Sequence, residues 1–171
     1  MLSLQAAVDV APTLVLAVGN PSRGDDALGP MLAERIDAMG MAGVEVLTDF
    51  QLQVEHALDL LGRRRVLFID ASASLDQPFA LTPIGPAKDD SFTSHAMAPS
   101  AVLYSFQQLV GPPPPAWVLG IRGASFELGE GLGAQAAAAL EAALPAVRSW
   151  LDADRSAGRA DGAGARSTGV G

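Results

Sequence analysis

Two adjacent acids, a third acid and a histidine are the residues of this chain whose types and positions could do chemistry. Asp25 and Asp26 follow the apolar stretch Thr13–Val18 across a polar turn. Asp70 ends a second apolar stretch, and His95 lies just before a predicted helix. Two carboxylates and an imidazole make an open site that suits a borderline divalent ion such as nickel, zinc or cadmium. The set has too few fixed ligands for a closed structural site, so positions are left for water or for a partner's ligands.

Each of these residues also has a structural interpretation. An acid before a helix is most often an N-cap, which applies to Asp25 and Asp26. Because neighbours in sequence normally point apart, these two are not expected to share a proton. A lone loop histidine such as His95 is usually incidental. Asp70 is the stronger functional indication, since burial of an acid at the end of an apolar strand is costly unless a partner or metal offsets it.

Strands that alternate with helices must position these residues. Strands are predicted at 13–18, 44–47, 66–69, 79–84 and 116–121, and helices at 28–39, 53–61, 99–110 and 133–151. This alternation is typical of a three-layer α/β/α fold with a mostly parallel, twisted five-stranded sheet, in which one edge strand could be antiparallel. Ligands of such sheets bind beyond the carboxyl ends of the strands, where Asp26, Asp70 and His95 could converge.

The composition fits one cytosolic domain. With 171 residues and 49% hydrophobic content, the chain can bury a core over 13–154, between a leader at 1–12 and a tail at 155–171 that is predicted to be disordered. The net charge of −8 argues against a nucleic-acid surface and an anionic membrane. The absence of cysteine excludes disulfides, thiol nucleophiles and thiolate ligands. The N-terminus lacks a basic region, and no apolar run approaches the ~20 residues of a membrane span.

Other charged residues receive structural interpretations. The run Arg63-Arg64-Arg65 follows a predicted helix end and is expected to be solvated and to complement the helix dipole. His56 is expected on the surface of the helix at 53–61. The buried side of that helix is predicted to carry Val54, Leu58 and Leu61. The chain lacks the serine-hydrolase elbow, the H-E-x-x-H zinc helix, the Walker loop and the dinucleotide-binding glycine motif.

Several short motifs, in this order and spacing, resemble the hydrogenase maturation endopeptidases. They are G-N-x-x-x-x-D-D-x-x-G at 19–29, Ile69-Asp70-Ala71, Ser94-His95 with Pro99 shortly after, and Gly123-x-x-Phe126-x-x-Gly129. The resemblance covers most of residues 13–150. Members of that family remove a short C-terminal extension from the large subunit of [NiFe] hydrogenases after nickel insertion, which lets the subunit close over its metal centre.

The resemblance implies a cytoplasmic, aspartic-type endopeptidase that acts on a hydrogenase large-subunit precursor. Asp26, Asp70 and His95 match the family's nickel-recognition residues, and Asp25 would cap or support the first helix. The nickel would arrive in the substrate, where it could polarise the scissile carbonyl or activate a bound water. Zinc or cadmium could occupy the same site in vitro.

The chain departs from the family pattern at two positions. Ala27 stands where many members have glycine, and Asp26 stands where many have glutamate. Gly24-Asp25-Asp26 and Phe50-Gln51-Leu52 look most like the members that serve cytoplasmic, NAD-linked hydrogenases. Three alternatives stay open: a nickel-checking chaperone that binds the precursor without cutting it, a metal-free aspartic peptidase, and a nucleotide-binding module suggested by the fold type alone.

Overall fold

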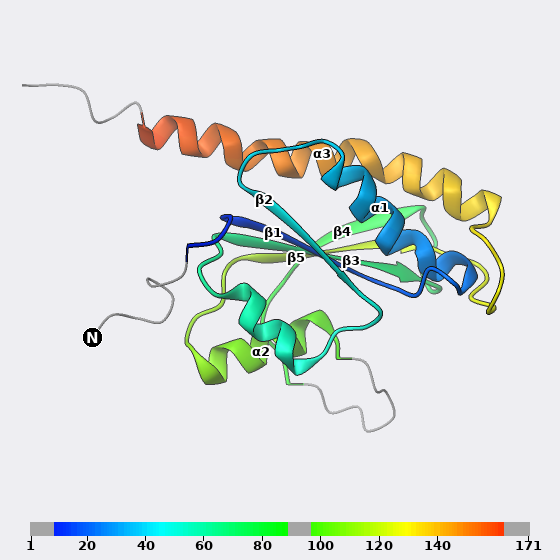
Figure 1. Cartoon of the computed structure of the whole chain (residues 1–171), viewed down its shortest axis with the longest axis horizontal. Coiled ribbons are helices and arrows are strands. Elements are labelled where there is room, and N and C mark those ends of the chain that lie inside the picture. Colours follow the sequence, from blue (N-terminus) through cyan, green and yellow to red (C-terminus); the bar gives the residue numbers. More distant parts are fainter. Residues whose placement is uncertain (1–8, 89–96, 163–171) are drawn as a thin grey trace, which may run out of the picture.

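A computed structural model of the chain describes residues 9–88 and 97–162, with side chains up to residue 153. In chain order its elements are β1 (Thr13–Val18), the 3₁₀ helix η2 (Gly24–Ala27), α1 (Leu28–Asp37), β2 (Val44–Asp49), the 3₁₀ helix η3 (Val54–Leu60), β3 (Arg65–Ser72), β4 (Phe79–Ile84), α2 (Pro99–Leu109), β5 (Ala116–Arg122) and α3 (Ala134–Gly162). The sheet lies between α1 and α3 on one face and α2 and η3 on the other (Figure 1). The predicted three-layer α/β/α fold is confirmed.

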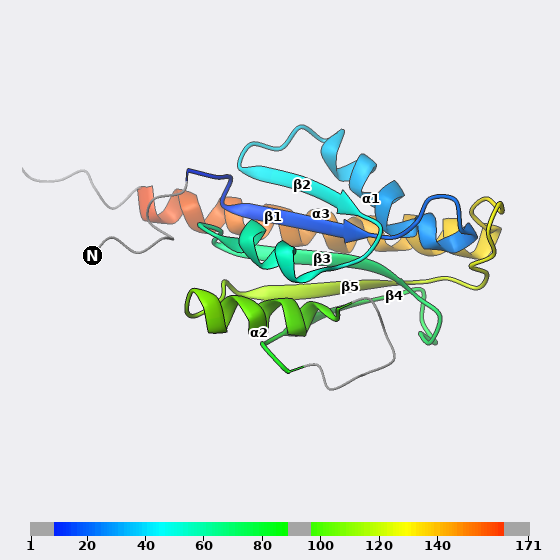
Figure 2. The ribbon, with the colours of Figure 1, turned by 60° about the horizontal axis from the view of Figure 1, so that its bottom comes forward.

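The five strands follow the order β2-β1-β3-β5-β4 (Figure 2). Neighbouring strands are parallel except β4, which pairs antiparallel with β5 at one edge, as predicted. From β1 the chain goes first to β2 on one side and then to β3 on the other. The crevice beyond the carboxyl ends of β1 and β3 is therefore the switch point at which open α/β sheets bind ligands.

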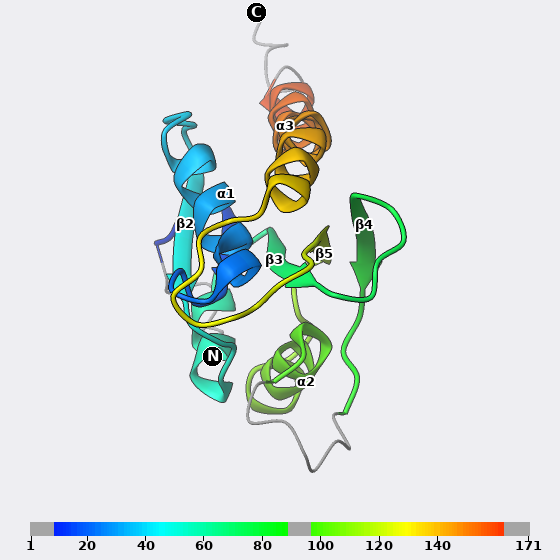
Figure 3. The same cartoon turned by 90° about the vertical axis from the view of Figure 1, so that its right-hand side faces the viewer.

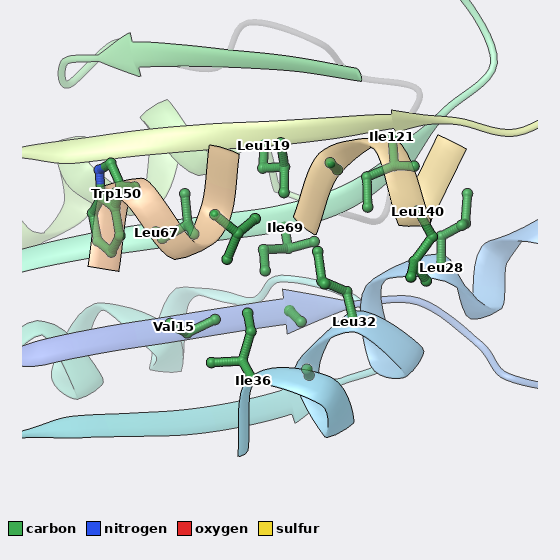
Figure 4. Packing of buried hydrophobic residues seen from close by; sticks show 14 of the residues in the cluster. Val15, Leu28, Leu32, Ile36, Leu67, Ile69, Leu119, Ile121, Leu140 and Trp150 are labelled. Atoms are coloured by element: carbon green, nitrogen blue, oxygen red, sulfur yellow. The ribbon is translucent and has the colours of Figure 1, made fainter. Parts of the chain in front are cut away.

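The core explains why β1 is apolar along its whole length. Val15 and Ala17 pack with α1 and α3, whereas Leu14, Leu16 and Val18 pack with η3 and α2. Figure 4 shows the first of these clusters. A central strand that is covered on both faces has no solvent side, so its residues read as a continuous apolar run.

Two arginines of the run that was predicted to be solvated are instead buried. Arg65, the first residue of β3, donates hydrogen bonds to the carbonyl oxygens of Trp150 and Leu151 in α3. Its guanidinium lies 3.8 Å from the centroid of the Trp150 ring. Arg63 forms an ion pair with Glu45 at 2.6 Å. The prediction is wrong because both arginines bind residues that are distant in the sequence. Arg65 joins β3 to α3, and Arg63 pairs with a residue of β2.

Arg65→Met is expected to lower the free energy of unfolding by about 3 kcal/mol. The substitution keeps the aliphatic stem, but it leaves two carbonyl oxygens of α3 without the guanidinium and removes the cation from the Trp150 ring. Urea unfolding measures the loss. Arg64→Met, at the exposed neighbouring position, is the matched control and should leave the midpoint nearly unchanged. Equal midpoints for the two variants would contradict this role of Arg65.

The second predicted helix is a 3₁₀ helix, which changes the side chains that it buries. Val54 is 49% exposed and Leu58 is 59% exposed, whereas Ala57 and Leu60 are buried. A 3₁₀ helix has three residues per turn, so Ala57 and Leu60 lie on one side of η3. The buried side predicted from a period of 3.6 residues is therefore wrong at Val54 and Leu58.

His56 is buried, which contradicts its predicted surface position. Its exposed fraction is 8%. The imidazole Nδ1 accepts a hydrogen bond from the Gln53 backbone N–H at 2.8 Å, and Nε2 lies 3.2 Å from Asp49 Oδ2. With Nδ1 as an acceptor, the ring proton belongs on Nε2, where it faces the carboxylate. His56 thus joins η3 to the end of β2.

The last helix is longer than predicted. α3 continues beyond residue 151 to Gly162, so residues 155–162 of the segment predicted to be disordered are helical. Alanine and arginine are strong helix formers, which favours this extension. Figure 3 shows α3, seen nearly along its axis, on the side of β3 and β5 opposite to α2. Within the ranges that the structure describes, no helix has the length and apolar character needed to cross a bilayer.

Candidate functional site

The chain leaves β1 through a turn in which backbone atoms approach very closely. A Cβ at Gly19, whose φ is 151°, would lie 2.0 Å from the carbonyl oxygen of Asp26. A Cβ at Gly29 in α1 would lie 2.3 Å from the Val18 oxygen and 3.3 Å from the Ile69 oxygen. Since no larger residue fits at either position, these glycines let η2 and α1 pack directly on the carboxyl ends of β1 and β3.

Asp26 is fixed at this turn by a hydrogen bond. Its Oδ2 accepts the backbone N–H of Asn20 at 2.7 Å, and Asn20 Oδ1 in turn accepts the N–H of Ser22. The carboxylate is half-buried, and among the described residues its Oδ1 has no hydrogen-bond partner. One oxygen therefore positions the side chain, and the other is available to a ligand.

Asp70 lies within β3, and the structure brings it next to Asp26. Strand alternation places Asp70 on the same face of the sheet as Phe68, which packs with α2. Burial raises the pKa of Asp70 to about 6, the Ala71 backbone N–H opposes this effect, and the negative charge of Asp26 adds to it. Two like charges that share a partly buried site are stabilised by a proton or a cation. Asp26 and Asp70 therefore lie close enough for their charges to interact, and their convergence with His95 in one site stays a prediction.

A cavity of about 330 Å³ lies beside Asp70, between the sheet and Pro99, the first residue of α2. His95 lies outside the described residues, so its convergence with the two acids stays a prediction. Within the described ranges, no group of three potential metal-ligating side chains occurs. Among the described residues, the candidate site therefore consists of two acids whose charges interact and of a cavity that Asp70 lines.

Asp25 points away from this pair and binds the loop between β5 and α3. Its Oδ2 accepts the N–H groups of Ala124 at 2.6 Å and Ser125 at 3.1 Å, and its Oδ1 accepts that of Gly133 at 2.8 Å. Burial by itself raises the pKa of Asp25, but the hydrogen bonds from Ala124, Gly133 and Ser125 outweigh burial, and the net pKa is lowered. Asp25 does not cap the first helix, because its side chain makes no cap hydrogen bond there; it supports the turn before that helix through these three hydrogen bonds.

The loop that Asp25 holds was not predicted to support the site. A Cβ at Gly123 would lie 2.9 Å from the Asp25 Cβ and 2.9 Å from the Phe126 ring, and the backbone N–H of Asp25 donates to the Ser125 carbonyl at 2.7 Å. The spacing of Gly123 and Phe126 was visible in the sequence as a motif. Its physical reason, close packing against η2, becomes clear only when residues about 100 positions apart are brought together.

The raised pKa of Asp70 makes the stability effect of Asp70→Asn depend on pH. Because the folded pKa is about 6 and the ordinary value is 3.8, the folded state keeps a proton that the unfolded chain releases. Wild-type stability therefore falls, relative to a neutral side chain, as pH rises from about 4 to about 6. Asp70→Asn is expected to gain stability relative to wild type over this range and to be more stable at pH 7.

Chemical unfolding at pH 4 and pH 7 measures this difference between the two proteins. Asp76, an exposed acid in the loop after β3, provides the control variant Asp76→Asn. The stability difference between this variant and wild type should be the same at pH 4 and at pH 7. A difference between Asp70→Asn and wild type that is the same at both pH values would contradict the raised pKa.

Comparison with solved structures identifies the fold. The hydrogenase maturating endopeptidase HybD from E. coli superposes with a TM-score of 0.66 and 24% identity, covering 83% of this chain and 93% of that chain. The [NiFe] hydrogenase maturation protease HycI from Thermococcus kodakarensis KOD1 gives 0.64 and 19%, covering 80% and 90%. The hydrogenase 2 maturation peptidase from Thaumarchaeota archaeon SCGC_AB-539-E09 gives 0.60 and 20%, covering 81% and 97%. No family model and no curated protein matches the sequence. The chain has the fold of the hydrogenase maturation proteases.

Proposed function

We propose that this protein is a cytoplasmic endopeptidase that removes the C-terminal extension of a [NiFe] hydrogenase large-subunit precursor after nickel insertion. The observation that carries the proposal is the pairing of Asp26 with Asp70 at the switch point of the sheet, in a fold shared with hydrogenase maturation proteases. Two carboxylates that repel one another in a partly buried site favour a cation. In this proposal, the cation is nickel that the precursor itself carries.

Asp26, Asp70 and His95 would bind this substrate nickel. His95 precedes Pro99 by four residues, a span of at most ~14 Å, and Pro99 lines the cavity beside Asp70. His95 lies outside the described residues, so its place in this ligand set is part of the proposal. Nickel in the substrate would polarise the scissile carbonyl or lower the pKa of a water molecule. Zinc or cadmium would suit the same mixed ligand set in vitro.

Of the two acids, Asp70 is the one that lines the cavity. Its pKa is raised to about 6 in the metal-free protein, and a bound nickel ion would lower that pKa and keep the carboxylate ionised as a ligand. One oxygen of Asp26 accepts the backbone N–H of Asn20, so the role of Asp26 would be to hold the substrate metal with its other oxygen. The chain has no cysteine nucleophile. The site would therefore lack an activated nucleophile until a substrate brings the metal, and this would protect other proteins from cleavage.

The partner subfamily is a finer proposal. Gly24-Asp25-Asp26 and Phe50-Gln51-Leu52 favour a precursor of the cytoplasmic, NAD-linked hydrogenases. Phe50 is 68% exposed and lines a groove of about 220 Å³ together with Gly19 and Pro21 of the turn that leads to Asp26. A residue in that position can contact a precursor that reaches the carboxylate pair.

A mass measurement of the precursor tests the proposed activity. Purified protein is incubated with nickel-loaded precursor, and loss of a C-terminal peptide is expected. An intact C-terminus in a stable complex would instead identify a chaperone that checks nickel without cutting.

The repulsion between Asp26 and Asp70 also favours a second candidate, a metal-free aspartic peptidase in which the two acids share a proton. Excess chelator separates this candidate from the first. Cleavage that continues after nickel has been removed from both protein and precursor, and that stops with a statine-like inhibitor, would establish the metal-free mechanism. The nickel mechanism predicts that chelator abolishes cleavage and that the inhibitor has little effect.

A further inference from the structure

Part of the α2 face of the sheet, next to Asp70, is open and forms the cavity of about 330 Å³, which we call the Asp70 trough. Its floor comes from β3, β5 and β4. Leu75, in the loop after β3, and Pro99, at the start of α2, also line it. Among the described residues that line the trough, Asp70 alone carries a charge. The trough thus meets the candidate site at Asp70, and the rest of its described lining is uncharged.

The floor of the trough carries unusually small side chains in one row. Asp70 of β3 lies opposite Gly120 of β5, and Gly120 lies opposite Ala80 of β4. Neighbouring strands are about 4.8 Å apart, so this row extends about 10 Å from the carboxylate towards the sheet edge. The adjacent row on the same face carries the larger Phe68, Val118 and Thr82.

Backbone geometry does not require the glycine at position 120. Its φ is not positive, and an added Cβ would meet only side chains, Leu75 Cδ1 at 3.3 Å and Ser72 Cβ at 3.8 Å. Gly19 and Gly29 differ in this respect, because a Cβ at either one would collide with a carbonyl oxygen. A glycine inside a strand weakens the strand and often marks a bulge or the close approach of a ligand. The pairing of β5 runs through Gly120 without a bulge, and Leu75 lies against this position, so the missing side chain keeps the floor of the trough low beneath Leu75.

We propose that the Asp70 trough binds an uncharged, apolar side chain of the precursor, from a residue that flanks the bond to be cut, and that Gly120 and Ala80 set the size of this side chain. The proposal rests on the proposed function for the identity of its substrate. An extended chain advances about 3.4 Å per residue. If the bond to be cut lies at Asp70, a side chain in the trough therefore comes from a precursor residue within one or two positions of that bond. An acidic side chain is rejected, because it would lose its hydration in a trough whose described lining carries no positive charge.

Substrate variants test the chemistry of the trough. Mass spectrometry of the wild-type reaction locates the cut, and the two flanking residues of the nickel-loaded precursor are then replaced in turn by alanine, leucine and aspartate. At one of the two positions, wild-type enzyme is expected to process the leucine precursor at least as fast as the alanine precursor. At that position the aspartate precursor should be at least about 100-fold slower.

Enzyme variants test the residues that set the size of the trough. Ala80→Val shortens the trough at its far end without touching Asp70. It is expected to lower kcat/KM for the leucine precursor about tenfold more than for the alanine precursor. Gly120→Ala raises the floor and should shift the same ratio in the same direction. Ala38→Val is the matched control, because it enlarges an exposed alanine after α1 on the opposite face of the sheet, and should leave the ratio unchanged.

Affinity for uncut precursor, measured by calorimetry for each protein, distinguishes failure of the trough from failure of the peptidase activity. If the wild type binds the precursor without cutting it, the peptidase activity is overturned. The trough is still supported in that case if Ala80→Val weakens binding of the leucine precursor about tenfold more than binding of the alanine precursor. If neither Ala80→Val nor Gly120→Ala shifts the leucine-to-alanine ratio in cleavage or in binding, the trough is overturned. Wild-type protein that neither binds nor cuts any precursor overturns both.

Discussion

Asp70→Asn is expected to abolish processing of the nickel-loaded precursor, with a rate at least ~10³-fold below that of wild type. The amide cannot accept a proton as a general base, and it removes one of the two negative charges that would bind the metal. Asp70 is partly buried, and its pKa is about 6 in the presence of Asp26. The loss of a proton acceptor and the loss of a negative charge would therefore both slow cleavage. Cleavage rates from the mass of the precursor over time measure the effect.

Asp76→Asn is the matched control for this prediction. Asp76 is an exposed acid only six positions further along, and its carbonyl oxygen rather than its carboxylate binds Arg122. Its replacement should leave the rate within about twofold of wild type, as is usual for exposed surface positions. Because Asp70→Asn is expected to be more stable than wild type at pH 7, unfolding cannot explain its inactivity. An Asp70→Asn protein that retains a tenth of the wild-type rate would contradict a role in proton transfer or metal binding.

Asp25→Ala is expected to lower the free energy of unfolding by at least about 3 kcal/mol at pH 7. The substitution leaves the N–H groups of Ala124, Ser125 and Gly133 without their acceptor in a buried position. It also releases the loop between β5 and α3 from η2. Because η2 carries Asp26 as well, the variant should also cut more slowly.

The effect of Asp25→Ala depends on pH in the opposite sense to that of Asp70→Asn. The folded pKa of Asp25 is lowered below its ordinary value, so the stabilisation is fully present above the unfolded pKa and is lost as pH falls through the folded one. The difference from wild type should therefore be largest at neutral pH and shrink below about pH 4. Urea unfolding over this range measures it, with Asp37→Ala, an exposed acid at the end of α1, as the control. A loss no larger than that of the control would contradict the structural role of Asp25.

The fold and the location of Asp26 and Asp70 near the carboxyl ends of β1 and β3 could be predicted because their signals are local. Apolar runs such as Thr13–Val18 indicate buried strands, and an acid next to a run of this kind lies at the carboxyl edge of a parallel sheet. Asp26 and Asp70 are both of this type. Phe79–Ile84 was also predicted correctly as an edge strand, because the proline within it is tolerated only at an edge or a bulge.

Roles that depend on distant partners could not be predicted. The sequence does not separate Asp25 from Asp26, because only the 3₁₀ turn directs one carboxylate to the loop at 124–133 and the other to the turn after β1. Arg65 looked like a solvated residue after a helix end, but its acceptors in α3 lie 85 and 86 positions away. His56 and Asp49 pair across a short loop because η3 is a 3₁₀ helix, which apolar periodicity does not reveal.

The position of Gly120 in the trough also depends on residues that are distant in the sequence. In the sequence it is one glycine within an apolar strand, which does not indicate a ligand. Its place between Asp70 and Ala80 follows from the register of three strands. The trough beside the carboxylate pair therefore could not be found before the sheet was assembled.

The most direct test of a substrate-borne metal is to compare cleavage of nickel-loaded and nickel-free precursor by the same purified protein. Because the charges of Asp26 and Asp70 repel one another in a partly buried site, a cation from the substrate would stabilise them. We therefore predict rapid cleavage of the loaded precursor and none of the nickel-free precursor above the background without enzyme. Equal rates on the two precursors would contradict the proposal that nickel in the substrate completes the site.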